Sequence, residues 1–260
     1  MGFCVFGNIA IAARYAQRMH GLKRAFIIDF DVHHGNGTND AFYEDPDIFP
    51  FNSPILSVAL FALYLVILLS YFCATCNQII LFSFEPRVYR KQPLYPTKGR
   101  GEAGSYPVTG KIDQIGSGSG EGSTLNLPGG SGDTAMRTVF DEVIVPCAQR
   151  FKPDIILVSA GYDAHLLDPL ASLQFTTGTY YMLASSIKQL AKDLCGGRCV
   201  FFLEGGYNLS SLSNSVAESF CAFLGDRSLA SELDDPSYLH EEPLKKVKQI
   251  IEKVKHIHSF

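Results

Sequence analysis

The sequence predicts one α/β domain built around a mainly parallel sheet. Continuous apolar runs at residues 25–28, 155–158 and 199–203 indicate strands that are buried on both faces. Helical patterns near 133–150 and 176–195 separate the later runs, and each run ends in a polar loop that contains glycine. This order is typical of parallel sheets whose functional site lies at the carboxyl ends of the strands. A chain of 260 residues with 47% apolar side chains can bury one sizeable core.

The first elements follow the same pattern. Residues 8–20 predict a helix of small and apolar residues, with Asn8 as its N-cap and Gly21 as its stop. Residues 23–30 predict a buried strand that ends in the polar cluster Asp29-Phe30-Asp31-Val32-His33-His34-Gly35-Asn36-Gly37.

Residues 51–104 do not follow this pattern. No charged residue occurs from Ile48 to Phe84, and residues 55–76 are long enough to span a bilayer as a helix. Residues 99–123 are rich in Gly and Ser and predict a loop. The sequence leaves open two interpretations, a foreign insertion in the domain or a single membrane span with membrane contact through 55–76.

The end of the chain predicts one more helix. Apolar residues recur at helical spacing among lysines in residues 243–260, which indicates an amphipathic helix packed on its own domain. The acidic stretch 232–242 before it indicates a solvated linker.

Charge and cysteine content limit the class of protein. A formal net charge of -4 provides no broad basic surface, so direct nucleic-acid binding is not expected. Seven scattered cysteines, an odd number in a long chain, fit a reducing intracellular compartment.

Side chains that could bind a metal follow the predicted strands. Asp29, Asp31 and His33 alternate along an extended segment, so they lean to one side of the chain. Asp163 follows the second buried run, and Tyr207 follows the third in a Gly-Gly-Tyr turn. Carboxylates gathered beside an imidazole at one sheet edge need a compensating cation, and oxygen and nitrogen ligands suit zinc. The alternative is a set of polar residues that only make turn hydrogen bonds.

Three segments resemble the signature blocks of the histone deacetylase family, which includes acetoin-utilisation proteins and acetylpolyamine amidohydrolases. They are Ile28-Asp29-Phe30-Asp31-Val32-His33-His34-Gly35-Asn36-Gly37-Thr38, Ser159-Ala160-Gly161-Tyr162-Asp163-Ala164-His165 and Leu203-Glu204-Gly205-Gly206-Tyr207-Asn208-Leu209. The Asn after His-His-Gly and the Asp-Ala-His block resemble class II, in particular the plant organelle type. The resemblance implies a three-layer arginase/deacetylase-like α/β fold. It assigns residues 1–50 and 105–225 to the domain, 51–104 to an insertion and loop, and 226–260 to a C-terminal tail with the amphipathic helix.

The resemblance also implies residue roles. Asp31, His33 and Asp163 would bind one Zn²⁺, and the Tyr207 phenol would hydrogen-bond the acetyl oxygen. Asp29 would orient a catalytic histidine and help to hold a structural K⁺. The walls of the substrate tunnel would be formed by Gly2, Phe3, Tyr106, Gly205 and Gly206.

The sequence departs from the family pattern at the general base. The family's base is a His-His pair upstream of the Gly-Phe-Cys block, and Met1 opens that block here. We therefore expect a zinc-dependent deacetylase of acetyl-lysine in histones or other proteins that is impaired in turnover, or a catalytically silent metal-binding remnant. The sequence leaves open the substrate, which ranges from acetylated proteins to small acetylamides. The oligomeric state and the compartment, nucleus and cytoplasm or plastid and mitochondrion, also stay open.

A membrane span over 55–76 would conflict with the metal site. It would place Asp31 and His33 on one side of the membrane and Asp163 and Tyr207 on the other. The enzyme and the membrane protein are therefore competing interpretations.

Overall fold

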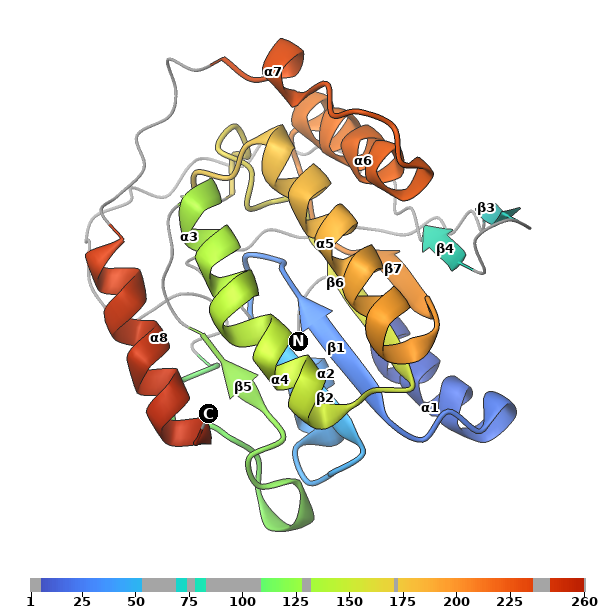
Figure 1. Cartoon of the computed structure of the whole chain (residues 1–260), viewed down its shortest axis with the longest axis vertical. Coiled ribbons are helices and arrows are strands. Elements are labelled where there is room, and N and C mark those ends of the chain that lie inside the picture. The colour runs from blue at the N-terminus through green and yellow to red at the C-terminus, as the bar shows by residue number, and fades with distance from the viewer. Residues whose placement is uncertain are drawn as a thin grey trace.

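A five-stranded sheet forms the centre of the molecule (Figure 1). The computed structural model describes residues 6–52, 69–73, 78–82, 109–127, 132–170, 173–235 and 244–259. Across the sheet the strands are β5 (Leu125–Asn126), β2 (Ile48–Asn52), β1 (Ala25–Asp29), β6 (Ile155–Ala160) and β7 (Cys199–Leu203). All four neighbouring pairs are parallel, which confirms the predicted fold class.

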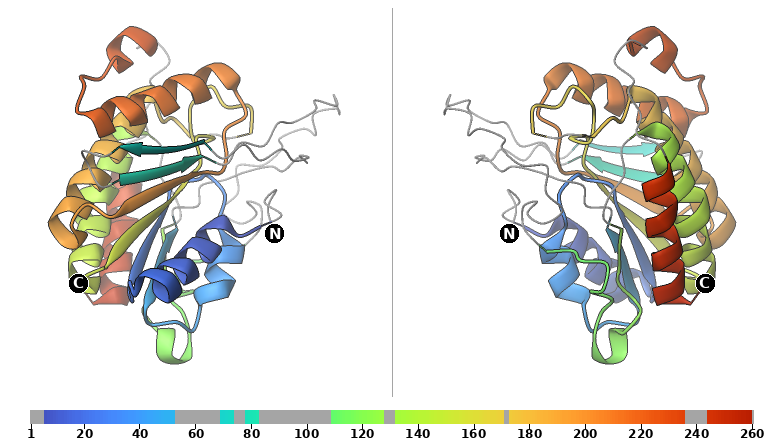
Figure 2. Two further views of the ribbon diagram at one scale, coloured as in Figure 1. Left: turned by 90° about the vertical axis from the view of Figure 1, so that its right-hand side faces the viewer. Right: turned by 90° about the vertical axis from the view of Figure 1, so that its left-hand side faces the viewer.

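Helices cover both faces of this sheet, so the domain has three layers (Figure 2). One face carries α1 (Asn8–His20) and α2 (Asn36–Phe42). The other face carries α3 (Asp133–Val139), α4 (Val145–Phe151), α5 (Thr177–Cys195) and α8 (Lys245–His258), while α6 (Leu209–Leu224) packs on α5 and is followed by α7 (Ala230–Leu233).

Strand β1 explains why both faces need a cover. All five of its residues are buried. Ala25 and Ile27 join the core under α1, whereas Phe26 and Ile28 join the larger core on the opposite face. Successive side chains of a strand point to opposite faces, so a continuous apolar run requires helices on both sides.

The helical run predicted at 133–150 contains a π-helical turn. Residues Phe140–Ile144 form this turn between α3 and α4, and Pro146 lies in the first turn of α4. Proline has no N–H and its ring crowds the carbonyl four residues earlier, so a wider turn upstream lets the run continue.

Two predictions about helix ends have different outcomes. Gly21 ends α1 in the left-handed conformation with φ 65°, as predicted. Asn8 as N-cap is wrong: Gly7 occupies the cap position and Asn8 is already helical. Glycine has no side chain, so the cap position of α1 provides no side-chain hydrogen bond to the first amides of the helix.

Helix α8 packs on its own domain, as predicted for the C-terminal amphipathic helix. Its apolar side chains Val247, Ile251 and Val254 are buried in the larger core. Lys255 pairs with Glu142 of the π-helical turn at 2.7 Å.

The interval 51–104 is described only in part. Strand β2 continues to Asn52, so the first two residues of that interval belong to the sheet. Strands β3 (Leu69–Cys73) and β4 (Gln78–Phe82) form an antiparallel pair, and β4 lies beside β7. A continuous helix over 55–76 is therefore wrong at 69–73, where cross-strand pairing replaces helical hydrogen bonds. Among the residues described, no helix has the length and apolar character needed to cross a membrane.

Candidate metal centre

The register of the sheet brings the polar loops together. At the end of β1, Asp29 lies opposite Ser159 of β6, and at the end of β6 Ala160 lies opposite Leu203 of β7. Parallel strands end at the same edge, so the loops that follow these three strands become neighbours. A backbone hydrogen bond also connects two of these loops, since the Tyr162 N–H donates to the Gly205 carbonyl at 3.0 Å.

Asp31, His33 and Asp163 converge at this edge, as the sequence predicted. Each offers one ligand atom, and these atoms lie within 4.8 Å of one another. His33 Nδ1 is 2.8 Å from Asp31 Oδ1 and 2.9 Å from Asp163 Oδ2. This is the one such group of three or more metal-ligating side chains within the described part of the chain.

Backbone amides orient the two carboxylates. The Val32 N–H donates to Asp163 Oδ1 at 3.0 Å, and the His33 N–H donates to Asp31 Oδ1 at 2.7 Å. Asp163 is fully buried, and its Oδ2 atom faces the His33 ring, with Nδ1 at 2.9 Å. A buried carboxylate oxygen that faces an imidazole fits a ligand for a cation.

The pKa shifts at this group agree with a place where positive charge is stabilised. Burial and the nearby Asp31 carboxylate raise the pKa of Asp163 to about 7. Burial disfavours the imidazolium of His33, but hydrogen bonds to Asp163 and Asp31 outweigh it and raise the pKa of His33 to about 10. In this arrangement a proton on His33 compensates the carboxylates, and a metal cation can take its place.

Two glycines leave the space that the carboxylates occupy. A Cβ at Gly161 would lie 2.1 Å from Asp31 Oδ2. A Cβ at Gly205 would lie 2.4 Å from Asp31 Oδ2 and 2.6 Å from Asp163 Oδ2. No side chain fits at either position, so the turn that carries Tyr207 lies directly against the carboxylates of Asp31 and Asp163.

Asp29 lies behind the ligand group. It is buried, and its Oδ1 atom accepts the Asp31 N–H at 3.1 Å. A Cβ at Gly35 would lie 2.4 Å from Asp29 Oδ2, so the loop after the ligands packs on this carboxyl. Burial and the neighbouring Asp31 raise the pKa of Asp29 well above its ordinary value.

Tyr207 lies in the turn between β7 and α6. Its backbone N–H donates to Asp168 Oδ2 at 2.7 Å. Gly206, just before it, has φ 125°, and a Cβ there would lie 2.9 Å from Leu212 Cδ1, so only glycine suits the turn. The predicted tunnel residues Gly2, Phe3 and Tyr106 lie outside the described residues.

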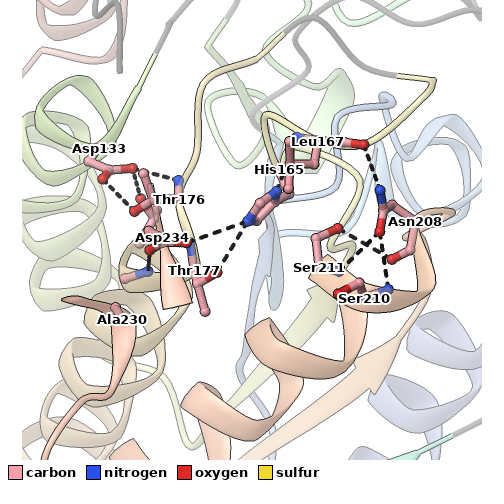
Figure 3. A network of polar contacts seen from close by, with 12 residues as sticks. Asp133, His165, Leu167, Thr176, Thr177, Asn208, Ser210, Ser211, Ala230 and Asp234 are labelled. Carbon is pink, nitrogen blue, oxygen red and sulfur yellow. Dashed lines mark hydrogen bonds and ion pairs between the residues drawn. The ribbon is translucent and has the colours of Figure 1, made fainter. Parts of the chain in front are cut away.

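The residues that hold the loop after Asp163 were not predicted from the sequence. Figure 3 shows this loop fixed on two sides. On one side His165 Nε2 lies 3.2 Å from Thr177 Oγ1, and Asp234 accepts the Thr177 N–H at 3.1 Å. On the other side Asn208 Nδ2 donates to the Leu167 carbonyl at 3.0 Å. The residue in the sequence that could have indicated these contacts is Asp168, an acidic residue five positions after Asp163.

Similar proteins agree with this geometry. The sequence model of the histone deacetylase domain matches residues 1–53 and 97–223. "Histone deacetylase 14, chloroplastic" of Arabidopsis thaliana is 62% identical over 262 residues, which cover 100% of this chain and 51% of that protein. "Histone deacetylase 10, chloroplastic" of Oryza sativa subsp. japonica is 61% identical, with coverage of 100% and 48%.

A solved structure has the same fold. The HD domain of HDA15 aligns with a TM-score of 0.70 and 30% identity, over 99% of this chain and 56% of that one. The chain spans about half the length of the two curated relatives it matches above. The family domain covers most of the chain, and it includes Asp31, His33, Asp163 and Tyr207. This chain belongs to the histone deacetylase family.

Proposed function

We propose that this chain holds one zinc ion through Asp31, His33 and Asp163 and acts as a lysine deacetylase. The observation that carries the proposal is the convergence of His33 Nδ1 with one oxygen of each carboxylate, within 4.8 Å. Family membership supports the hydrolysis of an acetyl amide. Two carboxylates and one imidazole suit zinc, and three protein ligands leave a position for water or substrate.

The ligand group also favours zinc over a hard cation that prefers an all-oxygen site. The imidazole ligand is typical of zinc and other first-row metals, whereas calcium and magnesium prefer oxygen alone. For Asp29 we propose a different role, in which its buried carboxyl contributes to a structural K⁺ site.

The reaction is the addition of water to the acetyl carbon and the release of the amine. The carbon–oxygen bond forms, the carbon–nitrogen bond breaks, and the products are acetate and a free lysine side chain. When bound, zinc supplies Lewis-acid polarisation of the carbonyl and lowers the pKa of water.

The chain's own residues provide orientation and charge. The amides of Val32 and His33 hold the ligand carboxylates in place. The Tyr207 phenol donates to the oxygen on which negative charge develops, and removing one such donor typically costs roughly 100- to 1,000-fold in kcat. Gly205 and Gly206 would lie at the inner end of the channel that admits the acyl chain.

The substrate is an acetylated lysine of histones or of other proteins. Relatives named histone deacetylases support a protein substrate. "Polyamine deacetylase HDAC10" of Homo sapiens, which is 33% identical over 86% of this chain, keeps a small acetylamide as an alternative. The names of the two plant relatives support a plastid location for this chain.

A catalytically silent zinc-binding protein is the second candidate. The three ligands suffice to hold the metal, whereas turnover also requires a general base, which contributes roughly 100- to 10,000-fold. The family's His-His pair is not among the residues of this chain. Zinc content and turnover therefore have to be measured separately.

The test compares the purified chain with Asp163→Ala and Tyr207→Phe. Zinc content and hydrolysis of an acetyl-lysine peptide are measured on the same samples. We expect about one zinc per chain in the wild type and in Tyr207→Phe, loss of zinc and of turnover in Asp163→Ala, and a kcat that is roughly 100- to 1,000-fold lower in Tyr207→Phe than in the wild type. Zinc without turnover would identify the silent protein, and a wild-type chain without zinc would contradict the proposal.

A further inference from the structure

Asp168 connects the metal-ligand loop to the turn that carries Tyr207. It lies in the loop after β6, five residues beyond Asp163, and only 5% of its surface is exposed. Its Oδ2 atom accepts the backbone N–H of Tyr207 at 2.7 Å and that of Asn208 at 3.3 Å. Its Oδ1 atom accepts the N–H of Leu170 at 2.9 Å.

A buried carboxylate that accepts three backbone amides is a strong and directional anchor. Bonds from amides to a charged acceptor are shorter and stronger than bonds between neutral groups. The three donors come from two loops, so the carboxylate fixes the distance between them. Asp163 and Asp168 therefore have different roles in one loop, since Asp163 contributes to the candidate metal centre and Asp168 holds the backbone of Tyr207.

The rest of the turn shows why such an anchor matters. The Glu204 N–H donates to the Ala160 carbonyl at 3.1 Å, which ties the start of the turn to β6. Gly206 follows with φ 125°, a conformation that glycine adopts readily. Because glycine has no side chain, the backbone just before Tyr207 is less restricted than at other residues. Beyond Tyr207, Asn208 Oδ1 caps α6 by accepting the N–H groups of Ser210 and Ser211, each at 3.1 Å. Asp168 is the contact that fixes the Tyr207 amide itself.

We propose that Asp168 is a positioning residue for catalysis, which sets the place of Tyr207 relative to the metal ligands. The proposal rests on the deacetylase function proposed above. Asp168 does not need to touch the substrate, because it acts through the backbone of Tyr207. A displacement of a catalytic group by about 1 Å can cost roughly 100-fold in rate, so a loosened turn should show in kcat.

The test is a double-mutant cycle between Asp168→Asn and Tyr207→Phe in the zinc-loaded chain. Asparagine keeps the size of the side chain but replaces one acceptor oxygen by an NH₂ group that faces backbone donors. We expect Asp168→Asn to lower kcat by roughly 10- to 100-fold with little change in KM and in zinc content. In the Tyr207→Phe background, Asp168→Asn should cost nothing more, because the group that it positions is already absent.

Asp133→Asn is the matched control. Asp133 also accepts a backbone amide, the N–H of Thr176 at 2.9 Å, but it does so at the start of α5. This variant should lose stability and keep kcat. If Asp168→Asn does not fold, Asp168→Glu is measured in its place, since it keeps the charge and moves it by one methylene group.

Three results would overturn the proposal. They are an unchanged kcat in Asp168→Asn, an undiminished effect of that change in the Tyr207→Phe background, and a loss of zinc that would assign Asp168 to the support of Asp163. A wild-type chain without turnover would contradict the proposed function and would leave the positioning role to a second measurement.

That measurement is the hydrogen exchange of the Tyr207 and Asn208 amides. We expect faster exchange in Asp168→Asn than in the wild type, and unchanged exchange in Asp133→Asn. Equal rates in the wild type and Asp168→Asn would refute the positioning role.

Discussion

At the scale of single residues, the candidate site depends on the close approach of backbone to carboxylate. Gly161 and Gly205 lie where any Cβ would overlap an oxygen of Asp31. The amides of Val32 and His33 donate to the Oδ1 atoms of Asp163 and Asp31, whereas the two glycines lie against Oδ2 atoms. Small substitutions at these positions should therefore lower the affinity for a metal more than they lower the stability of the fold.

Gly205→Ala should abolish zinc binding. The added Cβ would lie 2.4 Å from Asp31 Oδ2 and 2.6 Å from Asp163 Oδ2, so it would displace both ligands. Zinc content after desalting, measured by atomic absorption, checks this expectation. Gly37→Ala is the control, because a Cβ at Gly37 meets nothing within 4 Å. Full zinc content in Gly205→Ala would contradict the described packing.

Zinc affinity should increase with pH. In the metal-free chain the pKa of His33 is raised to about 10, so near neutral pH zinc must displace a proton from this ring. The release of one proton makes the affinity rise by about tenfold from pH 7 to pH 8. Competition with a calibrated chelator measures this slope. Substitution of the remote, exposed His20 by Gln should leave the slope unchanged, and a flat profile in the wild type would show that His33 is already neutral.

At the scale of elements, helices α8 and α5 are held by different kinds of contact. Helix α8 contributes buried apolar side chains to the larger core. Helix α5 is held at its N-terminus by carboxylates, since Asp133 accepts the Thr176 N–H and Asp234 accepts those of Thr177 and Gly178 (Figure 3). Negative charge near the first turn of a helix is stabilising, because the free amides and the helix dipole both favour it.

Ile251→Ala should destabilise the whole domain. Ile251 is fully buried in α8, and truncating such a side chain typically costs about 2–5 kcal/mol of the free energy of unfolding. Urea denaturation followed by circular dichroism measures the change. Gln249→Ala on the exposed side of α8 is the control, since alanine favours helix and no core contact is lost. Equal stability of the two variants would mean that α8 adds nothing to the core.

At the scale of the whole molecule, the candidate metal centre joins distant parts of the chain. Asp31 and His33 follow β1, whereas Asp163 follows β6, and the two strands are neighbours in the sheet. An ion bound by all three ligands would link the central strands of the domain. It binds the folded state, so its binding energy adds to the stability of the fold.

Removing zinc should therefore lower the stability of the wild-type chain. With free zinc at about 1,000 times its dissociation constant, binding stabilises the folded state by about 4 kcal/mol, and a chelator removes that contribution. Thermal denaturation with and without chelator measures the difference. Asp163→Ala should be insensitive to the chelator, and the same shift in both proteins would place the stabilising metal elsewhere.

The sequence alone was sufficient for the fold class and for the convergence of Asp31, His33 and Asp163. Apolar runs covered on both faces require a parallel sheet between helices, and parallel strands end at one edge, so Asp31, His33 and Asp163 had to meet there. It did not predict β2, because Pro50 in Ile48–Asn52 argues against a strand and the run continues into apolar residues. For residues 55–76 it left open a membrane-spanning helix or an insertion and did not predict the strand at 69–73, because hydropathy does not distinguish a buried helix from a paired strand.

Only the tertiary structure decided how the ligands and Tyr207 are held. The contacts of Asp168 with Tyr207 and of Asp234 with Thr177 join residues 39 and 57 positions apart, and no local pattern announces them. The need for glycine at 161 and 205 likewise arises from carboxylates that reach them across the sheet edge. Periodicity reports which face of an element is buried, whereas the partner of a polar group depends on how the loops meet after folding.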